Sequence, residues 1–113
     1  MYVHVRARRL PLTNALEEYV ERRIRFALGR FTLRISGVII RLSDTNGPRG
    51  GSDKRCSVNI VLRAPRSVLI LEETGADLYA TIDRAADRTA RSVNRRLEKE
   101  RDLHGERERS STR

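Results

Sequence analysis

At 113 residues, 38% of them apolar, the chain allows one domain with one hydrophobic core. No apolar run approaches the roughly 20 residues of a membrane-spanning helix, and the single cysteine, Cys56, excludes an internal disulfide, so we expect a cytoplasmic protein. The net charge is +9, and of 24 basic residues all but Lys54 and Lys99 are arginine, which predicts attraction to a polyanion.

The first half of the chain predicts a strand followed by a helix. Residues 2–9 alternate apolar with basic side chains, as a half-buried strand does. Pro11 ends this strand, and Thr13 or Asn14 then caps a helix over about residues 14–30, with Glu17 placed for a capping box. The apolar residues of this helix recur at helical spacing.

Three strand-like segments follow, at residues 34–43, 55–64 and 67–74. The glycine-rich residues 44–53 predict a long polar loop, and Pro65 with Arg66 predicts a tight connection. The alternation puts these residues of the first two segments on one face: Val38, Ile40, Leu42, Cys56, Val58, Ile60 and Leu62.

Asp77 is placed as the N-cap of a long second helix, whose apolar stripe fades after about residue 103. The order β-α-β-β-β-α predicts an α+β fold, a four-stranded sheet with two helices packed on one face, as in double-stranded-RNA-binding domains. We expect one domain over residues 1–104 and a flexible tail over residues 105–113.

Both helices carry basic residues on the side that faces solvent. The first helix has Arg22, Arg23, Arg25 and Arg30, and the second has a row at intervals of three and four: Arg84, Arg88, Arg91, Arg95 and Lys99. Helices lying side by side would join these rows into one surface for RNA phosphates.

Two simpler causes of the basic rows stay open. Cations near a helix C-terminus also interact favourably with the helix dipole. Asp83 and Asp87 are within reach of Arg88 and Arg91 for ordinary ion pairs along the second helix. A solvated, charged helix face therefore accounts for the number of cations, although not for their alignment in one row.

The aromatic residues narrow the mode of RNA binding. The chain has no Trp, two Phe and three Tyr, and most of them fall on apolar stripes. Platforms for stacking unpaired bases are therefore expected to be missing. This favours recognition of the phosphates and shape of folded RNA.

The sequence shows no enzyme signature, and we expect neither a metal nor a cofactor. His4 and His104 have no partners at metal-ligand spacing. Cys56 shares the face of Val58, which indicates a core residue and not a nucleophile. The glycine-rich segment GPRGGSDK lacks the ending of a phosphate-binding loop.

The stretch GADLYATIDRAADRTARSVNRRLEK, residues 75–99, resembles the ribosome hibernation-promoting factors, also called protein Y or the sigma-54 modulation family. The resemblance covers roughly residues 1–102, including Leu12, Thr13, Ala15 and Leu16 at the start of the first helix. The motif that carries it consists of Gly75, Asp77, Leu78, Tyr79, Ile82 and Asp83.

The resemblance implies a domain that binds small-subunit rRNA of the 30S or 70S ribosome, in the channel of messenger RNA and tRNA, and so inactivates idle ribosomes under stress or in stationary phase. Because the sequence continues only nine residues past His104, we expect the short type of this family, without the second domain of long-type members. By position, the rRNA contacts on the second helix would be Arg88, Arg91, Arg95, Arg96 and Lys99, with the arginines of the first helix a looser match.

Two alternative functions stay open from the sequence alone. One is a general binder of structured RNA on the same scaffold. The other is a protein-interaction or transcription-modulating module that forms a weak homodimer through the outer face of the sheet, where Ile39, Val61, Val68 and Ile70 are expected.

Overall fold

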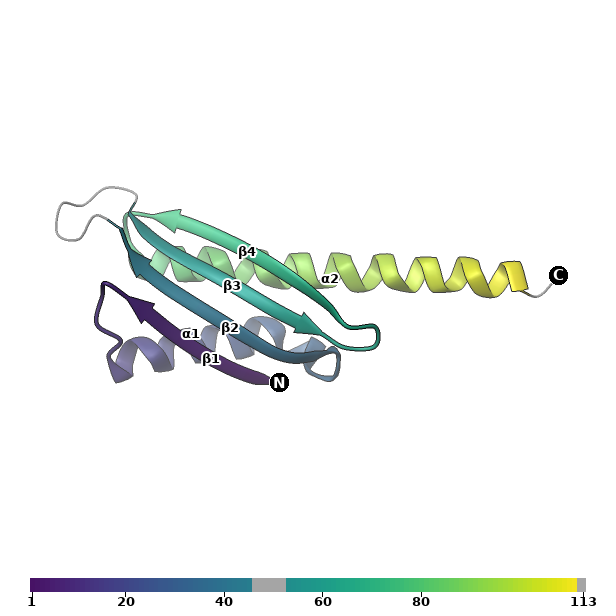
Figure 1. Cartoon of the computed structure of the whole chain (residues 1–113), viewed down its shortest axis with the longest axis horizontal. Coiled ribbons are helices and arrows are strands. Elements are labelled where there is room, and N and C mark those ends of the chain that lie inside the picture. The colour runs from purple at the N-terminus through teal and green to yellow at the C-terminus, as the bar shows by residue number, and fades with distance from the viewer. Residues whose placement is uncertain (46–52, 112–113) are drawn as a thin grey trace.

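The computed structural model describes residues 1–45 and 53–111, with side chains described up to residue 102. Most of the predicted loop at 44–53 lies outside the described residues. The elements follow the predicted order (Figure 1): β1 (Tyr2–Arg8), α1 (Asn14–Leu28), the 3-10 helix η1 (Gly29–Arg34), β2 (Ile35–Asp44), β3 (Lys54–Leu62), β4 (Ser67–Gly75) and α2 (Leu78–Ser111).

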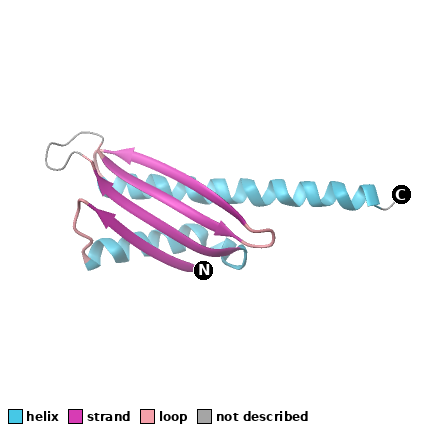
Figure 2. Ribbon diagram, in the orientation of Figure 1, coloured by secondary structure: helices cyan, strands magenta, loops and turns pink. Residues whose placement is uncertain are grey.

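The four strands form one mixed sheet in the order β1-β2-β3-β4. β1 and β2 are parallel, because α1 carries the chain back between them, whereas β2–β3 and β3–β4 are antiparallel. Figure 2 shows both helices behind the same face of the sheet. The predicted α+β class, with two helices on one face, is confirmed.

The core lies between the sheet and the two helices. The predicted inward residues of β2 and β3 are all buried, and Val20, Ile24 and Leu28 of α1 pack onto them. Each such fully buried aliphatic side chain contributes about 1.5–3 kcal/mol. The Cys56 thiol is 1% exposed, and burial raises its pKa to about 12, so it stays protonated as the core residue that the alternation predicted.

Two buried threonines interrupt the predicted apolar stripe of α2. Thr81 and Thr89 are both 0% exposed. Their hydroxyl groups donate to the carbonyl oxygens of Asp77 and Ala85, one turn earlier, at 2.7 and 2.6 Å. These local hydrogen bonds offset the cost of burying a hydroxyl group, so threonine is accommodated at these buried positions beside the apolar stripe.

The end of α2 differs from the expectation for the tail. The helix continues past Gly105 to Ser111, so the flexible segment expected from residue 105 is helical as far as Ser111. The sequence there is rich in Glu and Arg, which have high helical propensity. In Figure 1 this part of α2 projects beyond the sheet. The domain boundary at residue 104 stays a prediction.

The start of α1 distinguishes between the two candidate caps. The Thr13 hydroxyl oxygen accepts a hydrogen bond from the Leu16 backbone N–H at 3.2 Å, and Thr13 has extended backbone angles. Asn14 is instead the first helical residue and is exposed. Thr13 is therefore the N-cap.

Replacing the cap should destabilise the domain, whereas replacing its neighbour should not. We expect Thr13→Ala to lower the free energy of unfolding by about 1 kcal/mol, because it leaves a backbone donor of the first turn unpaired. Asn14→Ala is the matched control and should change it by less than about 0.5 kcal/mol. Urea unfolding followed by circular dichroism measures both, and equal losses would contradict the assignment.

Candidate RNA-binding surface

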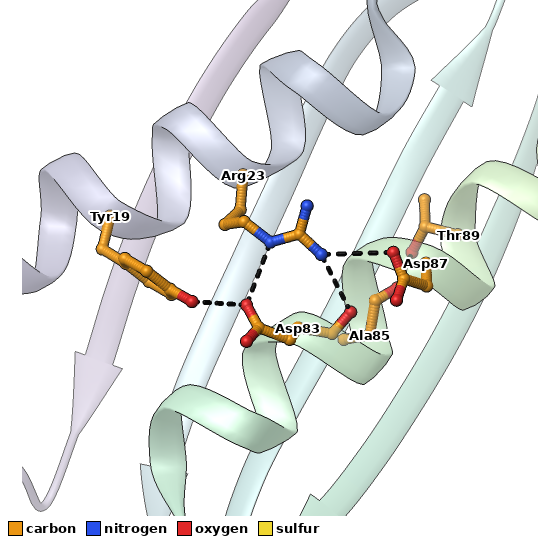
Figure 3. A network of polar contacts seen from close by, with 6 residues as sticks. All are labelled: Tyr19, Arg23, Asp83, Ala85, Asp87 and Thr89. Atoms are coloured by element: carbon orange, nitrogen blue, oxygen red, sulfur yellow. Dashed lines mark hydrogen bonds and ion pairs between the residues drawn. The ribbon is translucent and has the colours of Figure 1, made fainter.

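A polar clamp joins the two helices (Figure 3). The Tyr19 hydroxyl donates to Asp83 Oδ1 at 2.5 Å, and Arg23 Nε donates to the same oxygen at 2.9 Å. Arg23 Nη2 also reaches Asp87 Oδ1 at 3.2 Å. The contacts occur in the same order along both helices, so α1 and α2 lie side by side and run in the same direction.

The clamp is charged at neutral pH. The hydrogen bond from Tyr19, together with the Arg23 guanidinium, holds the pKa of Asp83 below its ordinary value. The same hydrogen bond raises the pKa of the Tyr19 hydroxyl, and the Asp83 carboxylate raises the pKa of Arg23. Each partner therefore favours the ionisation state that the contact needs.

The expectation that Asp83 and Asp87 pair along α2 is wrong. Both carboxylates pair with Arg23 of α1 instead. Helical spacing shows which residues share a face of one helix, but it does not show which neighbouring helix that face meets.

The motif that carried the family resemblance builds the start of α2. Asp77 Oδ1 accepts a hydrogen bond from Tyr79 N–H at 3.0 Å, which confirms Asp77 as the capping residue. The Tyr79 ring meets Tyr19 edge to face, with centroids 4.8 Å apart. A Cβ added at Gly75 would collide with the Arg84 guanidinium group, so glycine leaves the space through which Arg84 reaches the sheet.

The first two cations of the α2 row are engaged with the sheet. Arg84 donates to the Thr74 carbonyl oxygen at 2.9 Å, and Arg88 donates to the Glu72 carbonyl oxygen at 3.1 Å. Arg88 also pairs with Glu73 at 3.2 Å. β4 is an edge strand, so the two arginines satisfy carbonyl groups that would otherwise face solvent or another chain.

The remaining cations of the α2 row, and Arg96 beside them, are free in the described part of the chain. Arg91, Arg95 and Lys99 are exposed, Arg96 is half-buried, and none has a hydrogen-bond or ion-pair partner among the described residues. A hollow of about 260 Å³ is lined by Leu69, Ser92, Arg95, Arg96 and Lys99, where α2 meets β4. We call Arg91, Arg95, Arg96 and Lys99 the helical basic surface.

The helix dipole does not account for this surface. Dipole effects fall off within the last turn of a helix. Lys99 lies several turns before the end of α2 at Ser111, and Arg91 and Arg95 lie further away still. The alignment of these cations therefore has a different cause.

The four arginines of the first helical region differ in what they contact. Arg23 belongs to the clamp, and Arg25 pairs with Glu21 at 3.1 Å. Arg22 is exposed and has no partner among the described residues. Arg30 lies in η1, is exposed, and stands over the Phe31 ring at 4.7 Å. Only Arg22 and Arg30 of these four present a guanidinium group without a carboxylate partner in the described part of the chain.

The expectation that most aromatic rings are buried on apolar stripes is wrong. Phe26 is 83% exposed, Tyr2 63% and Tyr79 44%. Phe26 sits on α1 one turn after Arg22, off the buried face of that helix. An aromatic ring that is accessible to a nucleic-acid base is therefore present beside the basic residues. The spacing of the apolar residues in the first helix already excluded Phe26 from the core.

The outer face of the sheet carries the expected apolar residues. Val68 and Ile70 are 47% and 67% exposed, and Ile39 and Val61 are half-buried beside them. Their placement on this face is confirmed, whereas the homodimer through it stays a prediction. Among the described residues, no helix is long and apolar enough to cross a membrane.

Residues 3–101 match the family described as Sigma 54 modulation protein / S30EA ribosomal protein. The chain belongs to this family. A curated member, the ribosome hibernation promotion factor of Deinococcus radiodurans, is 32% identical over 88 residues, which is 78% of this chain and 44% of that protein. The chain thus spans less than half the length of this relative.

Two solved structures have the same fold as this S30EA family member. The N-terminal domain of Thermus thermophilus protein Y is 29% identical, with a TM-score of 0.69, and the match covers 84% of this chain and 98% of that one. A ribosomal subunit interface protein from Coxiella burnetii, 18% identical, has a TM-score of 0.71 over 87% and 99% of the two chains. The second likeness shows the fold alone.

Removing the charge of the clamp should weaken the fold in a pH-dependent way. We expect Asp83→Asn to lower the free energy of unfolding at pH 7 by about 1 kcal/mol, a modest value because the Asp83 side chain is 43% exposed. The pKa of Asp83 is lower in the folded state than in the unfolded state, where it is about 4. The Asp83 carboxylate therefore contributes its full stabilisation of the fold above about pH 4, and this stabilisation is lost as the pH falls through the folded-state pKa.

The difference between wild type and Asp83→Asn should therefore shrink between about pH 5 and pH 2. Urea unfolding at several pH values measures it. Asp102→Asn, a change at an exposed carboxylate of the same helix, serves as the control and should leave stability nearly unchanged. A difference that persists at the lowest pH would show that the Asp83 charge does not stabilise the clamp.

Proposed function

We propose that this chain is a ribosome-associated hibernation factor. It binds small-subunit rRNA in the channel of messenger RNA and tRNA and so inactivates idle ribosomes under stress or in stationary phase. The observation that carries the proposal is the row of free cations on α2, in a chain of the S30EA family. The hibernation factor of Deinococcus radiodurans supports the ribosome as the target. Such a protein acts in the cytoplasm and blocks by occupancy, without catalysis or a cofactor.

The fold divides the basic residues between two roles. Arg23, Arg25, Arg84 and Arg88 have partners within the domain, so we assign them to holding the helices and the edge of β4 in place. We assign direct phosphate contacts to the free cations Arg22, Arg30, Arg91, Arg95, Arg96 and Lys99. Guanidinium groups bind phosphate with two parallel hydrogen bonds, and a rigid helix presents several of them in register with an RNA backbone.

Reversing the charge of the helical basic surface should abolish ribosome binding. We expect the triple variant Arg91→Glu, Arg95→Glu, Lys99→Glu to stay at the top of a sucrose gradient, whereas the wild type sediments with purified small subunits. None of these side chains has a partner within the described part of the domain, so thermal unfolding should change little.

Single reversals provide the matched comparison. Arg91→Glu and Arg66→Glu each change the charge by the same amount at an exposed position, but Arg66 lies in the turn before β4. Only Arg91→Glu should weaken binding markedly. Co-sedimentation of the folded triple variant would refute the helical surface as the contact. Equal affinity of the wild type for small subunits and for an unrelated folded RNA would favour a general RNA-binding domain.

The exposed ring of Phe26 should add a stacking contact. We expect Phe26→Ala to weaken binding to small subunits by about 1–3 kcal/mol, because it removes the ring on which a base stacks. Stability should stay unchanged because the ring is 83% exposed. Leu33→Ala, at an apolar position that is 89% exposed but not aromatic, is the control. A Phe26→Leu variant that binds like the wild type would exclude stacking.

A further inference from the structure

The outer face of the sheet, opposite the helices, is divided into two halves. The strand register brings these residues together in rows across the sheet. Rows at one end are aromatic and apolar, with Tyr2, His4, Ile39, Val61, Val68 and Ile70. Rows at the other end are basic, with Arg6, Arg8, Arg41 and Arg55.

The basic half contains three arginines without a carboxylate partner among the described residues. Arg6 is the direct register partner of Arg41, and Arg8 lies two residues further along β1 on the same face. All three are exposed and have neither a hydrogen-bond nor an ion-pair partner in the described part of the chain. The one described carboxylate on this face, Glu72, lies in the same row as Arg6 and Arg41, two strands away from Arg41, and pairs with Arg55 at 3.3 Å.

This arrangement is unfavourable for the isolated domain. Neighbouring strands lie about 4.8 Å apart, so the like charges of Arg6 and Arg41 at register-paired positions repel each other. No acidic side chain of β1 or β2 offsets this repulsion, because every other outward position of these two strands is uncharged or basic. An external anion would remove the repulsion, and several phosphates at once would do so for all three side chains.

The neighbours of the three arginines favour a nucleic-acid backbone over a protein. Ser43 and Ser57 flank Arg41 on this face, and their hydroxyl groups suit phosphate oxygens. Protein interfaces instead have an apolar centre, and the apolar residues lie at the other end of the face. A hollow of about 370 Å³ runs along the same corner, lined by Arg6, Ala7, Arg8, Arg41 and Leu42.

We propose that Arg6, Arg8 and Arg41 form a second phosphate-binding site, the sheet basic patch, which contacts an RNA segment different from the one under the helices. The domain is then held between RNA on two opposite sides. This inference rests on the proposed function and extends it, since the domain would bind the ribosome through both of its faces and not through the helical face alone.

The test measures how RNA affinity depends on salt, with two probes. One probe is a plain RNA duplex, and the other is purified small ribosomal subunits. The variants are the neutralised sheet patch (Arg6→Gln, Arg8→Gln, Arg41→Gln), the triple charge reversal of the helical basic surface, and both combined. Arg66→Gln removes an exposed arginine at the opposite end of the sheet and is the control.

We expect the neutralised patch to reduce the magnitude of the slope of log K against log salt by about 2, since each phosphate contact contributes about 0.7–0.9. The helical reversal should keep weak, salt-dependent binding to the duplex, and the combined variant should lose it. Arg66→Gln should change the slope by less than the contribution of one phosphate contact, about 0.7–0.9.

An unchanged slope with the duplex would overturn the sheet patch. Loss of subunit binding with normal duplex binding would also overturn it, because the partner of the patch would then be an acidic protein. Failure of the wild type to bind small subunits would refute the proposed function, while the duplex measurements would still decide whether the patch binds phosphate.

Discussion

Three consecutive residues at the start of α2 determine what each side of this helix meets. Ile82 is buried in the core, Asp83 binds Tyr19 and Arg23 of α1, and Arg84 reaches the edge of β4. Successive helical residues are rotated by about 100°, so these contacts point in three directions and fix the rotation of α2 about its axis. The direction in which the later described cations of the helix point, up to residue 102, follows from this rotation.

The same constraint explains why the basic residues are not equivalent. Near the clamp, carboxylates and carbonyl oxygens engage the arginines, and the charge there serves the packing of the two helices and the sheet. Further along α2, Arg91, Arg95 and Lys99 are exposed and have no ion-pair partner among the described residues. The family motif therefore lies at a distance from the proposed contact and orients a helix whose proposed RNA contacts lie beyond the motif.

The proposed function places demands on both sides of the thin domain. A single layer of helices on a single sheet leaves the outer face of the sheet open. One half of that face is apolar and the other half is basic. A domain that occupies a channel has surroundings on all sides. Cations on both faces of the domain are consistent with RNA on both sides of it, whereas binding through the helical face alone does not require cations on the sheet.

The sequence alone determined the order of the elements, the buried faces of β2 and β3, the cap at Asp77 and the family, because periodicity and capping depend on residues close together in the chain. It also located the basic rows. Only the tertiary structure decided which arginines are free: Arg23 and Asp83 meet across 60 residues, and Arg88 meets Glu73 on another element. The pairing of Arg6 with Arg41 likewise depends on strand register, which spacing along one strand does not contain.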